Sequence, residues 1–162
     1  MSGFTHLHTV SGFSLRYGAS HPERLAERAA VRGMDALALT DRDSLSGAVR
    51  FARACEKEGV RPIFGTELAV EPQVAEGAPA HRPRTPARGG AFVDESAPRV
   101  TFLARDGARG WAELCRLVTA AHSGAADRGA GRPLAGRDAL PAEGLTVLLG
   151  PASEVGAALA AG

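Results

Sequence analysis

The chain has 162 residues, 44% of them hydrophobic, and a net charge of +1 at pH 7. This length allows one hydrophobic core and little more than one domain. The near-neutral charge argues against a broad basic surface that binds nucleic acid by counterion release. The sequence has no signal-peptide pattern and no run of about 18 apolar residues, so we expect a cytoplasmic protein without membrane association.

The first motif in the chain is an apolar-flanked His-x-His formed by His6 and His8. We expect a short strand over residues 3–8. Side chains two residues apart in a strand point to the same face, so the two imidazoles would project side by side. This is the geometry of a pair of metal ligands. The alternative is a pair of structural histidines held by hydrogen bonds.

Helix and strand signals then alternate. Ser20 and Glu23 form a capping-box pattern around Pro22, which predicts a helix over 21–32 that ends at Gly33. The apolar run 36–40 predicts a parallel strand that is covered on both faces.

A second helix is expected before Gly59, and a strand over 62–70 follows it. Four residues recur at helical spacing and form its predicted inner face: Leu45, Val49, Ala52 and Cys55. Cys55 and Cys115 both fall in helical patterns, so we expect buried free thiols in a reducing compartment.

Two segments lack these patterns. Residues 71–98 contain five prolines and three arginines with little apolar sequence, which predicts a disordered surface insertion. Its arginines could contact phosphate, although a solvated loop is the simpler interpretation. The Gly/Arg/Pro-rich stretch at 123–137 predicts a flexible loop. His21, His81 and His122 have no spacing that indicates a ligand role.

Order is predicted again in the second half of the chain. The elements are a strand over 100–104, a helix over 110–121 with Trp111, Leu114, Leu117 and Val118 inward, a strand over 145–149 and a helix over 153–161. Strand and helix units of this length favour a parallel α/β sheet or barrel, in which functional groups gather at the carboxyl ends of the strands. A barrel with so few strands would be open, so we expect the front part of something longer.

Several motifs resemble a known family. They are HLH at 6–8, GASHP at 18–22, ALTD at 38–41, FGTEL at 64–68, VTFLARD at 100–106, WAELCRL at 111–117 and GLTVL at 144–148. In this order they resemble the polymerase-and-histidinol-phosphatase (PHP) domain, most closely the amino-terminal PHP domain of bacterial DNA polymerase III alpha subunits and error-prone alpha-type polymerases. The resemblance implies an incomplete, distorted (β/α)7 barrel in which residues 1–162 form the N-terminal portion.

Active members of this family bind metal ions at the strand ends and hydrolyse phosphoesters. Bridging metals lower the pKa of a bound water and neutralise charge on the phosphate oxygens. The resemblance implies that His6, His8 and Glu67 match ligand positions of the family, and zinc or manganese suits such ligands.

Four further ligand positions depart from the family pattern. The resemblance places Tyr17 where the family has an aspartate, and Arg42 where it has the histidine of Thr-Asp-His. It also aligns Arg99 with a histidine that opens the next strand, and Pro151 with a late ligand position that is often cysteine. A guanidinium stays protonated and offers no lone pair, so arginines here would repel a divalent cation. We therefore expect no cofactor.

Arg42 could instead form a charge-assisted pair with Glu67 or Asp41 and fill the place of a metal with an organic cation. Asp41 would then line the site. The simpler interpretation of Asp41 and Asp43 is that they form a turn and place negative charge at the N-terminus of the following helix.

Two functions remain open. The first is a non-catalytic PHP module at the front of an error-prone polymerase for DNA replication and damage-tolerant repair. It would contact the remaining polymerase domains or other replication and repair proteins, and DNA only indirectly. The second is a metal-dependent phosphoesterase, as a residual 3′–5′ exonuclease or a small-molecule phosphatase. The departures from the ligand pattern favour the first. The chain is too short to contain a polymerase palm, so we do not expect it to synthesise DNA.

Overall fold

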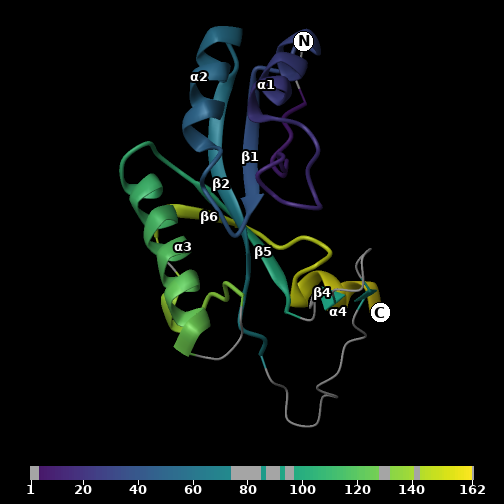
Figure 1. Ribbon diagram of the computed structural model, residues 1–162, viewed down its shortest axis with the longest axis vertical. Helices are drawn as coiled ribbons and strands as arrows, with labels where there is room; N and C mark the ends of the chain where they lie inside the picture. Colours follow the sequence, from purple (N-terminus) through teal and green to yellow (C-terminus); the bar gives the residue numbers. More distant parts are fainter. Residues whose placement is uncertain are drawn as a thin grey trace.

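The computed structural model describes residues 4–73, 85–86, 92–93, 97–127, 132–140 and 143–161. Its helices are α1 (Pro22–Val31), α2 (Ala48–Glu58), α3 (Arg109–Asp127), α4 (Glu154–Ala161) and the 3-10 turn η1 (Arg137–Ala139). Its strands are β1 (Ala36–Arg42), β2 (Arg61–Ala69), β3 (Thr85–Pro86), β4 (Phe92–Val93), β5 (Arg99–Ala104) and β6 (Leu145–Leu148). Figure 1 shows α1 and α2 beside β1 and β2, and α3 beside the part of the sheet formed by β5 and β6.

The main sheet is mixed, with strand order β1-β2-β5-β6. β1 and β2 are parallel, as predicted, but β5 runs antiparallel to β2, and β6 runs antiparallel to β5. The prediction of an all-parallel sheet is therefore wrong. After α3 the chain returns to the end of β5 before it enters β6, as the hydrogen bond from Arg105 N–H to the Gly144 carbonyl shows (3.1 Å). A strand that starts where its neighbour ends must run in the opposite direction.

The first core cluster lies between α1, β1 and α2. Its buried side chains include Ala26, Leu37, Leu39, Phe51 and Cys55. β1 is buried over six consecutive residues, which confirms a strand that is covered on both faces.

Two details of the predicted helices in this cluster are wrong. Glu23 closes no capping box, because His21 is the N-cap of α1 and no side chain caps its first turn. Val49 is 63% exposed, because α2 turns Ala48 and Phe51 inward. Gly59 ends α2 in the left-handed conformation with φ 69°, as predicted.

The second core cluster lies between α3 and the other strands. Leu114 and Leu117 of α3 pack with Leu68 and Phe102, which confirms the predicted inner face of this helix. Phe64 joins the two clusters, because its ring packs edge-on against Phe51 and Trp111, with centroid distances of 6.3 and 5.6 Å.

The segments predicted to lack order are only partly described. Residues 74–84, 87–91 and 94–96 of the 71–98 insertion lie outside the described residues, and so does His81. β3 and β4 within it form a two-stranded antiparallel sheet. α3 continues to Asp127, so residues 123–127 are helical and the prediction of a loop is wrong there. His122, one residue beyond the helix predicted over 110–121, also lies in α3.

The sequence predicts a strand over residues 3–8, but residues 4–10 do not form a regular strand. The segment nevertheless runs along β1, because Ala38 N–H donates to the His6 carbonyl (2.9 Å) and Thr40 N–H donates to the Thr9 carbonyl (2.8 Å). These bonds bring His6 and His8 to β1. None of the helices in the described part of the chain combines the length and apolarity needed to cross a bilayer.

The close approach of strands at Gly65 gives a stability prediction. A Cβ atom at Gly65 would lie 2.5 Å from the Phe102 carbonyl oxygen and 2.6 Å from Leu103 Cδ2. We expect Gly65→Ala to lower the free energy of unfolding by roughly 1–3 kcal/mol, because backbone atoms must shift. Urea denaturation measures this change. The control is Gly107→Ala, since a Cβ there meets no atom within 4 Å. Equal stability of the two variants would contradict the prediction.

Candidate functional site

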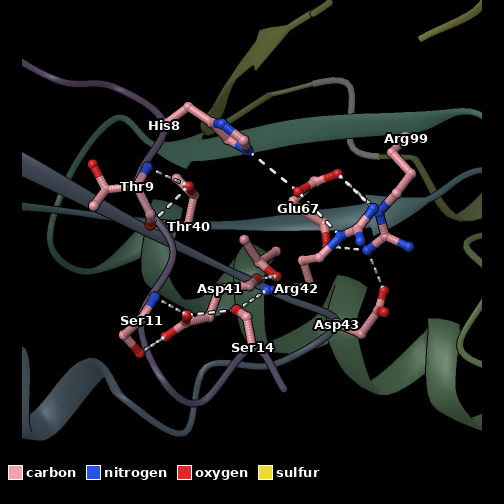
Figure 2. A network of polar contacts seen from close by, with 11 residues as sticks. His8, Thr9, Ser11, Ser14, Thr40, Asp41, Arg42, Asp43, Glu67 and Arg99 are labelled. Carbon is pink, nitrogen blue, oxygen red and sulfur yellow. Dashed lines mark hydrogen bonds and ion pairs between the residues drawn. The ribbon is translucent and has the colours of Figure 1, made fainter. Parts of the chain in front are cut away.

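The candidate site lies at one end of the sheet, where β1 ends, β2 carries Glu67 and β5 begins (Figure 2). Arg42 at the end of β1 is the register partner of Glu67 on β2. The antiparallel β5 begins at Arg99, and Thr101 is the partner of Glu67. Residues two apart in a strand share a face, so Arg99 lies diagonal to Glu67 on the same side of the sheet.

The carboxylate of Glu67 is the centre of this site. It accepts a hydrogen bond from Arg99 Nε at 2.8 Å and a longer one from Arg42 Nη2 at 3.4 Å. His8 Nε2 lies 3.2 Å from the other carboxylate oxygen. The three charged side chains are each at most 14% exposed, whereas His8 is 54% exposed. The predicted contact between Arg42 and Glu67 is therefore present, and Arg99 adds a shorter one.

Neighbouring groups affect the pKa of Glu67 more strongly than burial does. Burial alone disfavours the carboxylate and raises its pKa, but the hydrogen bond from His8 and the charges of Arg99 and Arg42 lower the pKa to about 2. Glu67 is therefore ionised at neutral pH. Its negative charge is shared between two guanidinium groups.

Arg99 also fixes the turn after β1. Its Nη2 donates to Asp43 Oδ1 and to the backbone carbonyl of Glu67, each at 2.9 Å. Asp43 is a turn residue, as predicted, with φ 57°. Its carbonyl accepts a hydrogen bond from His122 Nε2 at 2.7 Å. Sequence reasoning missed both the Asp43–Arg99 pair and the His122 contact, which join residues 56 and 79 positions apart.

Asp41 anchors the loop that follows the His-x-His segment. It is buried, and its carboxylate accepts hydrogen bonds from Ser11 N–H (2.6 Å), Ser11 Oγ (2.8 Å) and Ser14 Oγ (2.6 Å). The interpretation of Asp41 as a charge at a helix N-terminus is wrong, because β1 extends to Arg42 and α2 begins only at Ala48. Sequence reasoning missed the two serines.

The remaining predicted positions are more exposed. The His6 ring is exposed and packs edge-on against Phe4 at a centroid distance of 4.7 Å. The ring of Tyr17 stacks under Arg42, whose Cζ lies 3.6 Å from the ring centroid. Pro151 is exposed in the turn before α4, and the next residue, Ala152, accepts a hydrogen bond from Arg99 N–H at 2.8 Å.

Comparison with known proteins identifies the family. The family model of the PHP domain matches residues 6–158. The chain belongs to the PHP domain family. It is similar to error-prone DNA polymerases of Symbiobacterium thermophilum (42% identity over 75% of this chain) and Mycobacterium tuberculosis (41% over 78%). It covers 9% and 10% of those relatives, so it spans about a tenth of their length.

Solved structures give weaker similarities. A candidate metal-dependent phosphoesterase from Bifidobacterium adolescentis aligns with a TM-score of 0.46 and 20% identity, over 77% of this chain and 34% of that protein. A sulfate-bound amidohydrolase from Chromobacterium violaceum aligns with a TM-score of 0.44 and 23% identity, over 78% of this chain and 35% of that protein.

A divalent metal, which the PHP family implies, does not fit the residues present. Glu67 already accepts hydrogen bonds from two guanidinium groups, which are permanent cations without a lone pair. Within the described ranges, no three His, Cys, Asp or Glu side chains come together to hold an ion. His8 and Glu67 meet, as the resemblance implies, but His6 packs on Phe4.

Removing the charge of Asp41 tests its role as the anchor of the 11–18 loop. We expect Asp41→Asn to lower the free energy of unfolding by about 1–3 kcal/mol, because an amide group cannot accept all three buried hydrogen bonds. Hydrogen exchange should also accelerate at the amides of Ser11 and Ser14. The exposed Asp138→Asn is the matched control. Unchanged exchange in this loop would show that Asp41 does not hold it.

The low pKa of Glu67 predicts a pH-dependent stability. A carboxyl whose folded pKa is about 2, against 4.5 ordinarily, stabilises the fold above pH 4.5 and loses this contribution as the pH falls toward 2. We expect Glu67→Gln to be about 3 kcal/mol less stable than the unmodified chain at pH 7, with the difference shrinking below pH 4.5.

Urea denaturation over a pH series measures this difference, with the exposed Glu56→Gln as the control. A Glu67→Gln deficit that stays constant from neutral to acid pH would mean that the ion pairs do not stabilise the fold.

Proposed function

We propose that the chain is a non-catalytic PHP module that forms a structural or interaction platform of an error-prone polymerase, in DNA replication and damage-tolerant repair synthesis. The observation that carries this proposal is the binding of Glu67 by Arg42 and Arg99 at the strand ends. Active members of the family that the chain resembles hydrolyse phosphoesters with a metal-activated water, and in this proposal the two arginines take the place of that metal.

The charge balance of the site supports this proposal. Two guanidinium groups supply two positive charges beside Glu67, and Asp43 compensates the charge of Arg99 at 2.9 Å. Both carboxylates are therefore already paired, and a divalent ion entering here would have to displace a guanidinium group in a poorly solvated place. In this proposal the arginines hold the strand ends together and occupy the Glu67 carboxylate that a metal ion would need.

The length of the relatives supports a role within a larger assembly. Because the chain spans about a tenth of the error-prone polymerases it resembles, we propose the remaining polymerase domains as its partners. In this proposal the four-stranded sheet is the N-terminal part of an incomplete, distorted (β/α)7 barrel. Contact with DNA is indirect.

Metal content and hydrolysis test the proposal together. We expect the unmodified chain, purified without chelators, to carry metal far below one ion per chain. We also expect no hydrolysis of an aryl phosphodiester with added Mn²⁺ or Zn²⁺. The triple variant Tyr17→Asp/Arg42→His/Arg99→His removes both guanidinium groups, and we expect it to take up Mn²⁺ or Zn²⁺. Elemental analysis by mass spectrometry and calorimetric titration measure the uptake.

The control is Arg109→His/Arg116→His, because both arginines are exposed on α3. Stoichiometric metal in the unmodified chain, with hydrolysis that a chelator removes, would overturn the proposal in favour of a phosphoesterase. This outcome is measured on the unmodified chain, so it does not depend on whether the triple variant folds. A folded triple variant that binds no more metal than the control would show that the arginines do not exclude the ion.

A further inference from the structure

A cavity of about 540 Å³ lies between the turn that follows β1 and the helix α3. The hydrogen bond between His122 Nε2 and the Asp43 carbonyl, at 2.7 Å, joins its two walls. Small-molecule sites in proteins have volumes of about 300–1,000 Å³, so this cavity has a suitable size for a ligand. It is distinct from the Glu67 site, because Glu67 is not among the described residues that line it.

The described residues that line the cavity include no Asp, Glu, Lys or Arg. Two of them are apolar, Leu45 and Val118, and both pack against the second core cluster. A charged ligand would lose water here without meeting an opposite charge. The lining therefore favours an uncharged ligand with an apolar face. The other lining residues are polar: Ser44, Ser46, Thr119, His122 and Ser123.

Three of these polar groups already donate a proton inside the protein. The Thr119 hydroxyl donates to the Cys115 carbonyl at 2.8 Å. The Ser44 hydroxyl donates to Ser46 Oγ at 2.8 Å. His122 Nε2 must also donate, because a carbonyl oxygen can only accept, and in the neutral ring this leaves Nδ1 as an acceptor. These three groups can only accept further hydrogen bonds, so a complementary ligand supplies N–H or O–H donors.

We propose that this cavity binds an uncharged ring compound that carries N–H donors, a class that a free amino-purine nucleoside represents. The flat face of the base covers Leu45 and Val118, and its amino group donates to the acceptors of Thr119 and His122. Binding requires neither a metal nor any change in the arginines at Glu67. The inference therefore stands or fails separately from the proposed function.

Titration of the full chain with adenosine tests the proposal, with the amide chemical shifts of residues 44–46 and 118–123 as the measurement. We expect a Kd of roughly 0.1–1 mM, which is usual for a ligand of this size. Purine riboside has a hydrogen atom in place of the amino group, so it should bind about threefold more weakly or worse. 5′-AMP should bind no more tightly than adenosine, because the described lining offers its phosphate no cation.

Two variants of α3 test the location of the site. Thr119→Val keeps the shape of the side chain and removes an acceptor, so it should weaken adenosine binding by roughly threefold or more. Its matched control is Thr146→Val, an exposed position on β6 outside the described lining. Ser123→Trp places a bulky ring at the cavity and should abolish binding, whereas the exposed Ala112→Trp makes a similar change elsewhere on α3.

The dispersion of the amide spectrum checks that each variant is folded. Adenosine that causes no shifts at these residues at roughly 5 mM would overturn the proposal, because the expected Kd lies well below that concentration. Tighter binding of 5′-AMP or equal binding of purine riboside would also overturn it. So would a loss of binding that is as large in the control variants as in the cavity variants.

Discussion

The ion pairs at Glu67 hold together three strands that the chain supplies from distant positions. β1 ends at Arg42, β2 carries Glu67 and β5 begins at Arg99, and the carboxylate links both arginines. Because the three side chains are nearly buried, each charge depends on the others for solvation. Removing the anion would leave two cations facing each other in a place that water reaches poorly. The rest of the site follows from this arrangement, since Arg99 positions Asp43 and the turn after β1, and Arg42 stacks on Tyr17.

A second buried anion holds the N-terminal segment against this centre. Asp41 lies next to Arg42 in β1, yet it bonds to Ser11 and Ser14 and fixes the loop that contains Tyr17. Neighbouring residues in a strand point to opposite faces, so the side chains of Asp41 and Arg42 lie on opposite faces of the sheet. The Ser14 hydroxyl connects them, because it donates to Asp41 and accepts from the Arg42 N–H at 2.9 Å.

The sequence predicts the local elements well and the long-range contacts less well. Apolar runs and glycine stops locate β1, β2, β5, β6 and the four helices, because burial and backbone conformation are local properties. The direction of β5 and β6 is missed, since it depends on how the chain returns between β2 and β5 and again after α3. The motif resemblance brings His8, Arg42 and Glu67 to one site. Asp41 with its serines, and Asp43 with Arg99, join residues whose spacing carries no periodic signal.

An arginine pair and a metal ion can both hold strand ends together, but the stability that each provides depends on different conditions. A fold that needs a bound ion gains stability with the concentration of that ion by mass action. A fold that uses arginine on a buried carboxylate is independent of ion supply, but it depends on the carboxylate staying ionised. With the pKa of Glu67 lowered to about 2, this condition holds far below neutral pH. In the proposed function, guanidinium groups stand where the family has imidazole ligands, and the catalytic metal ion is absent. The fold then does not depend on the concentration of that ion, while the strand ends remain joined.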